Sequence, residues 1–86
     1  MVTESPGVTS YDTRLLDRAA TLRSDAELME EYARRLRATA ATLGDCPAAP
    51  EWSRPTLEQQ AAACITAAQQ LRTAAAALLA HVRAGD

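Results

Sequence analysis

The 86-residue sequence has no lysine and no phenylalanine, and it holds only two tyrosines, one tryptophan, one histidine and two cysteines. Two cysteines are too few for a disulfide framework, and their spacing does not match a metal site. No apolar run is long enough to span a bilayer, and the first residues lack the basic and apolar regions of a cleaved signal peptide. The net charge of -2 gives no electrostatic attraction to nucleic acid or to an acidic membrane. We therefore expect a cytoplasmic protein, or one exported without a cleaved signal peptide, with no nucleic-acid partner, no membrane insertion and no bound metal.

Alanine is abundant instead, at 20 of the 86 residues. It favours helices but contributes little buried area, so a single domain of this length has a marginal core that oligomerisation would complete. The sequence contains no Gly-rich phosphate loop and no paired carboxylates or other arrangement typical of catalysis. We therefore expect no enzymatic activity, no cofactor and no small-molecule substrate.

A heptad repeat runs through both halves of the chain, with alanine at position a and large apolar residues at position d. In the first half, position a holds Ala19, Ala26, Ala33 and Ala40, and position d holds Leu15, Leu22, Met29, Leu36 and Leu43. In the second half, position a holds Ala61, Ala68, Ala75 and Val82, and position d holds Leu57, Cys64, Leu71 and Leu78. The repeat predicts two long helices that present matching stripes.

The limits of these helices follow from the breakers beside them. Gly44 and the prolines after it end the first helix, Thr56 and Gln59 form a predicted capping box, and Gly85 ends the second helix. The predicted organisation is a flexible arm 1–11 and a helical hairpin 12–84, made of helix 12–43, loop 44–55 and helix 56–83, then a C-terminal end 85–86.

The predicted fold is all-α, an antiparallel helix–turn–helix hairpin in which large residues face small ones. Two registers half a heptad apart keep this alternation, so the sequence leaves the register open. Apolar residues also lie outside the seam, which indicates a second hairpin docked on this one as a four-helix bundle. The predicted partner-binding residues are Leu16, Leu28, Tyr32, Ile65 and Leu79, with Trp52 at the loop end.

A helical hairpin of this length with a lone tryptophan, Trp52, in its turn resembles the WXG-type, ESX-like proteins of type VII secretion systems. The resemblance covers most of the chain and implies a four-helix bundle, formed by a homodimer or a heterodimer that is exported as a folded unit. The chain departs from the family at two places. Arg54 stands where the family has the glycine of its Trp-x-Gly motif, and the tail ending at Asp86 lacks the family's tyrosine.

Other interpretations stay open at this point. The chain is also compatible with a cytosolic adaptor, chaperone or antitoxin-like subunit, or with a nucleic-acid-binding regulator that uses an arginine cluster at residues 34, 35 and 37. Trp52 either covers the end of the hairpin or recognises a partner. Cys64 is either a small buried apolar residue or forms a disulfide with Cys46 in an oxidising compartment.

Overall fold

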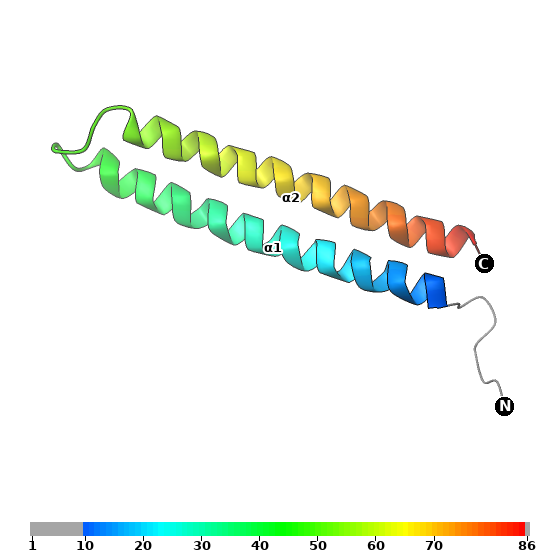
Figure 1. Cartoon of the computed structure of the whole chain (residues 1–86). Helices are drawn as coiled ribbons and strands as arrows, with labels where there is room; N and C mark the ends of the chain where they lie inside the picture. Colours follow the sequence, from blue (N-terminus) through cyan, green and yellow to red (C-terminus); the bar gives the residue numbers. More distant parts are fainter. Residues whose placement is uncertain (1–9, 86) are drawn as a thin grey trace.

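The computed structural model describes residues 10–85, which form two helices and the loop between them. Helix α1 runs from Ser10 to Gly44 and α2 from Ser53 to Ala84. The helices lie side by side along their whole length and run in opposite directions (Figure 1). The prediction of an all-α antiparallel hairpin is confirmed. Most of the predicted arm, residues 1–9, and the final residue Asp86 lie outside the described residues.

Helix α2 begins three residues earlier than the sequence predicts. Its N-cap residue is Trp52, whose side chain makes no capping hydrogen bond, so the predicted capping box of Thr56 and Gln59 is wrong. The helix can start ahead of Pro55 because the first backbone N–H groups of a helix have no partner within it, so a proline there loses no hydrogen bond. The N–H of Ser53 donates to the carbonyl of Pro50 at 3.0 Å and starts the first turn.

The loop between the helices consists of consecutive tight turns rather than an extended segment. Backbone N–H groups of Cys46 and Ala49 donate to carbonyls three residues earlier, at 3.1 Å in both cases. At Gly44 the side chain of Arg54 lies close over the backbone, and a Cβ on that glycine would come within 3.3 Å of the Cδ atom of Arg54. A side chain at Gly44 would therefore require the side chain of Arg54 to shift slightly.

Alanine alone forms the fully buried seam between the helices. The seven alanines at position a are 0–1% exposed, and no larger side chain among the described residues is fully buried. Small side chains let two helix backbones approach closely, which explains why this row lies directly on the line between the helix axes. The buried row is Ala19, Ala26, Ala33 and Ala40 on α1 with Ala61, Ala68 and Ala75 on α2.

The position of the alanine row divides the hairpin into two faces. At about 100° per residue, position d lies about 60° to one side of position a, and position e lies about 40° to the other side. The d row is half-buried throughout, and we call its side of the hairpin the open face. The open face includes Leu15, Leu22, Met29, Leu36 and Leu43 of α1 and Leu57, Cys64, Leu71 and Leu78 of α2.

The opposite side, which we call the bridged face, carries the e residues of both helices. Here Arg72 of α2 reaches Glu30 of α1 with two hydrogen bonds, from Nη1 to Oε2 at 2.6 Å and from Nη2 to Oε1 at 2.9 Å. Both residues follow a d position by one, so an antiparallel arrangement brings them to the same side. This two-pronged ion pair ties the helices together near their middle and fixes their relative position.

Candidate partner-binding surface

The open face carries a continuous row of apolar side chains that the two helices cover only in part. Its d residues come from both helices, and each is partly exposed to solvent. None of them carries a charge. A half-covered apolar row that continues along two adjacent helices is the expected arrangement for one side of a helix bundle.

Two side chains project beyond this row at the middle of α1. Leu28 is 59% exposed and Tyr32 is 54% exposed. Together with Met29, Glu31 and Arg35 they line a shallow groove on the helix surface. Arg35 donates to Glu31 at 3.0 Å along the rim of this groove. The groove therefore has an apolar floor and a polar edge, as many protein-binding sites have.

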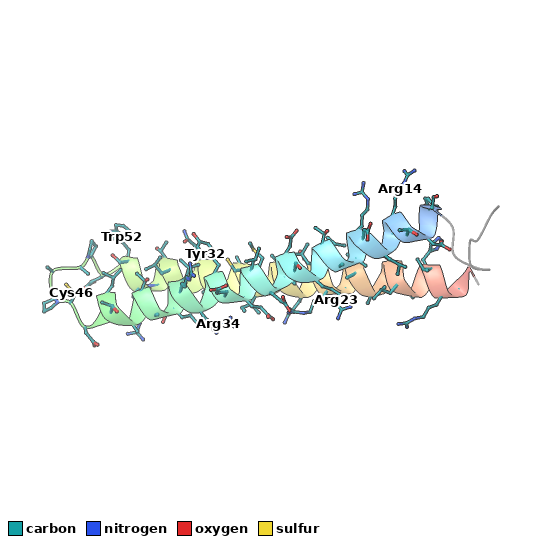
Figure 2. All side chains as sticks on the ribbon, turned by 90° about the horizontal axis from the view of Figure 1, so that it is seen from below. Arg14, Arg23, Tyr32, Arg34, Cys46 and Trp52 are labelled. Carbon is teal, nitrogen blue, oxygen red and sulfur yellow. The ribbon has the colours of Figure 1, made fainter. Side chains whose placement is uncertain are left out.

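The predicted partner-binding residues do not form one surface. Tyr32 and Leu28 lie on the outer flank of α1, about 60° and about 100° beyond the d row, whereas Leu16, Ile65 and Leu79 occupy e positions on the bridged face. Figure 2 shows Tyr32 on one side of the hairpin and Arg23 and Arg34 on the other. Ile65 and Leu79 are already half-buried one heptad to either side of Arg72, and Leu16 is 39% exposed.

The ion pair on the bridged face lowers the pKa of the Glu30 carboxyl group. The hydrogen bonds from Arg72, and then the positive charges of Arg72 and Arg34, lower the pKa of Glu30 below its ordinary value of 4.5 although desolvation opposes them. A carboxylate whose pKa is lower in the folded state than in the unfolded state stabilises the fold at pH values above the unfolded-state pKa. That contribution disappears as the pH falls through the folded-state pKa.

We predict that the variant Glu30→Gln makes the hairpin less sensitive to acid. The wild-type protein should lose stability as the pH falls below about 4.5 because Glu30 becomes protonated. The variant should be less stable than the wild type at pH 7 and should show a smaller further loss in acid. Urea denaturation followed by circular dichroism, at pH 7 and at a pH below about 4.5, measures the free energy of unfolding of each protein. The control Glu51→Gln, at an exposed loop position, should lose as much stability in acid as the wild type. If the Glu30→Gln variant also lost as much stability in acid as the wild type, the prediction would be contradicted.

Trp52 does not cover the end of the hairpin. Its side chain is 68% exposed and leaves Leu43 and Leu57 partly open, so the capping alternative is wrong. In Figure 2 the indole projects to the same side as Tyr32. The adjacent residue Ser53 is instead buried, at 7% exposed. Trp52 therefore belongs to the accessible surface of the hairpin.

Both cysteines are free thiols in this structure, Cys46 exposed and Cys64 half-buried. Backbone hydrogen bonds hold Cys46 in the turn beyond Leu43, while Cys64 lies about 16 Å along α2 from the start of the helix at Ser53. Cys64 fits the alternative of a small apolar residue beside the seam.

The three arginines of the predicted cluster do not all lie on one face of α1. Successive residues are about 100° apart on a helix, so Arg35 points away from Arg34 and Arg37, which are three residues apart and about 60° from each other. Arg35 pairs with Glu31, and Arg34 lies close enough to Glu30 to lower its pKa. The structure thus disperses the positive charge that the sequence places together.

Within residues 10–85 no group of three or more His, Cys, Asp or Glu side chains is placed to hold a metal ion. Neither helix of this described region has a segment that is both long and apolar enough to cross a membrane. Comparisons with protein-family models, with curated proteins and with solved structures found no match to this chain.

Sequence reasoning missed one feature of the surface, the ion pair between Glu30 and Arg72. The signal was present, because the two opposite charges both follow a d position by one residue. Without a fixed register, however, Glu30 could not be assigned to one particular arginine.

Proposed function

We propose that this chain is a protein–protein interaction module whose hairpin completes its core by docking the open face on a second helical hairpin, giving a four-helix bundle. One observation carries the proposal: among residues 10–85 the only fully buried apolar side chains are seven alanines, while every large residue of the d row is only partly buried, on one face.

The energetics of burial support a partner. Complete burial of a leucine contributes about 1.5–3 kcal/mol, whereas the single methyl group of an alanine contributes about 0.8 kcal/mol. The isolated hairpin therefore obtains little stability from its seam and leaves the larger contribution of the leucines incomplete. A second hairpin on the open face would bury the d row from both sides and supply the missing part.

In its specific form, the proposal is an ESX-like protein associated with type VII secretion, which is exported, or escorts another protein, as a folded dimer. The helix–turn–helix architecture and the exposed position of Trp52 at the loop end support it. An accessible indole beside an open apolar face fits recognition by a partner better than a structural role. Assembly would take place in the cytoplasm, before export.

Sedimentation of the purified chain, with helix content measured by circular dichroism, tests the interaction module. We expect either a self-associated helical species or a monomer that is incompletely helical and gains structure with a partner. A monomer that is fully helical and melts at a high temperature independent of dilution would refute the proposal, because such a chain needs no partner.

Export is tested separately in the source organism. We expect the chain in the culture medium of cells with an intact type VII secretion ATPase and inside cells in which that ATPase is inactivated. A chain that stays inside the cell in both strains would refute the secretion role and leave a cytosolic adaptor or chaperone subunit as the form of the module.

A further inference from the structure

We propose that the bridged face binds a second kind of partner, a single acidic amphipathic helix that lies lengthwise over the junction of α1 and α2. The apolar residues of that helix would cover Ile65 and Leu79. Its carboxylates would bind Arg23 and Arg37. The inference goes beyond the proposed function, because it concerns the side of the hairpin that a second hairpin on the open face would leave uncovered.

The bridged face holds predicted partner-binding residues that docking on the open face does not use. Leu16, Ile65 and Leu79 all occupy e positions there. Ile65 and Leu79 are half-buried, and Leu16 is 39% exposed. The two helices thus cover these aliphatic side chains only in part, so this side of the hairpin also offers apolar area to a partner.

The bridged face has an excess of positive charge although the whole chain is acidic. Position b lies on the same side as position e, about 60° further around each helix. Across both helices the e and b positions hold five arginines and three glutamates, whereas the chain has a net charge of -2. These residues are Arg23, Arg34, Arg37, Arg72 and Arg83, with Glu27, Glu30 and Glu58. Acidic residues therefore predominate elsewhere in the chain.

The charges on this face are paired unequally. Two of its three glutamates already bind an arginine of the hairpin, Glu30 with Arg72 and Glu58 with Arg54. Among residues 10–85, three exposed arginines of this face make no ion pair, namely Arg23, Arg37 and Arg83. A guanidinium group binds a carboxylate with two parallel hydrogen bonds, so these side chains favour a partner that carries carboxylates.

The ion pair between the helices sets the spacing of two equivalent sites. One heptad to one side of it, the antiparallel arrangement brings Arg23 of α1 opposite Leu79 of α2. One heptad to the other side, Arg37 lies opposite Ile65. Each site combines an unpaired arginine with a half-buried aliphatic side chain, and the two sites are about 21 Å apart along the hairpin.

This spacing favours a helix as the occupant. A distance of about 21 Å corresponds to two heptads, so a helix that runs alongside α1 and α2 presents the same stripe of residues at both sites. An extended peptide would have to satisfy its own backbone groups, and the backbone N–H and C=O groups within two helices are already hydrogen-bonded.

An acidic helix also fits this surface better than a nucleic acid does. A duplex carries one negative charge per about 1.7 Å of its axis, so its phosphates would meet the glutamates of the face as well as the arginines. A helix brings carboxylates only to the positions that its heptad places beside Arg23 and Arg37. Its apolar residues match Ile65 and Leu79, which phosphates cannot do.

Titration of the purified protein with labelled peptides tests the inference at low ionic strength, where exposed charges are least screened. The probe is a helical peptide of about three heptads, with one leucine and two glutamates on the same side of each heptad. The same peptide with glutamine in place of glutamate should bind at least about tenfold more weakly, and a DNA duplex of equal length should also bind more weakly. Fluorescence anisotropy measures each dissociation constant. A glutamate peptide that does not bind, or that binds no better than either of the other two, would overturn the inference.

A pair of matched variants locates the binding site. Arg23→Gln/Arg37→Gln should weaken binding of the glutamate peptide about 5- to 30-fold. The control Arg14→Gln/Arg18→Gln changes the net charge equally but at c and g positions, away from the bridged face, and should stay within about twofold of wild type. Glutamine is a good helix former, and circular dichroism checks that both variants keep their helix content.

The comparison of the two variants decides the outcome. If the control weakened binding as much as Arg23→Gln/Arg37→Gln, net charge alone would explain the effect and the inference would be overturned. If only the control weakened binding, the peptide would lie on the open face, which also overturns it. Neither result depends on whether a second hairpin docks on the open face, so the proposed function is tested separately.

Discussion

Replacing Ala33 with leucine should destabilise the hairpin by about 2–3 kcal/mol. Ala33 is 0% exposed and lies on the line between the two helix axes, where the backbones approach most closely. Three additional carbon atoms at that point cannot be accommodated by a rotamer change, because the backbone of α2 lies directly opposite. The helices would have to separate locally, which would weaken neighbouring seam contacts and strain the Glu30–Arg72 ion pair. Urea denaturation at one fixed protein concentration measures the change.

The same substitution at Ala38 is the matched control. Ala38 lies on α1 five residues further along and is exposed on the outer side of the helix. Alanine and leucine have similar helix propensities, so Ala38→Leu should change stability by less than about 0.5 kcal/mol. If the two variants were equally stable, the alanine row would not be the closely packed seam of the hairpin.

The heptad pattern was sufficient to predict the fold because alanine marks position a in both helices and a larger apolar residue marks position d. Alanine recurs every seven residues over almost the whole of both helices, and a repeat of that length persists only in continuous helices. The ends of the helices were predicted less well. Thr56 and Gln59 match a capping box, but Pro55 just before them is tolerated in a first helical turn, so the sequence permits the earlier start at Ser53.

The two faces of the hairpin depend on the rotation of each helix about its own axis. The heptad positions alone do not show which row faces the other helix. If the line between the helix axes ran midway between positions a and d, both rows would be equally buried. The sequence would then give no reason to assign the remaining apolar residues to different faces. In this structure the a row is central, because alanine allows the shortest distance between the helices. The d row is thereby turned to one side and the e row to the other. This rotation separates Leu28 and Tyr32 from Leu16, Ile65 and Leu79, which the sequence placed in one surface.

The asymmetry also explains how the two faces differ in role. On the bridged face, a charge-assisted pair already joins the helices and the adjacent apolar residues are half-covered. On the open face, the d row is half-buried and has no ion pair between the helices among the described residues. In the proposed bundle, the hairpin's own contacts join the helices on the bridged face and the partner covers the open face, so substitutions on the two sides should have different consequences.

The variant Leu28→Gln/Tyr32→Gln should abolish association at micromolar concentration. Both side chains are exposed in the single hairpin, at 59% and 54%, so their replacement by a good helix former should leave the monomer folded. With about 1–2 kcal/mol for each buried side chain, the two substitutions cost about 2–4 kcal/mol for each hairpin that carries them, which is about 30- to 700-fold in the dissociation constant for one hairpin. Sedimentation velocity detects the change from dimer to monomer.

The control Tyr11→Gln/Leu16→Gln removes the same two residue types from the same helix. Both side chains are exposed, but Leu16 lies on the bridged face and Tyr11 lies at the N-terminal end of α1, far from the centre of the groove. The control should remain a dimer with a dissociation constant within about tenfold of wild type, because neither residue is at the centre of the contact. If this control dissociated while the Leu28 and Tyr32 variant did not, the partner would bind the bridged face. The ion pair between Glu30 and Arg72 would then lie inside the interface rather than on the surface opposite to it.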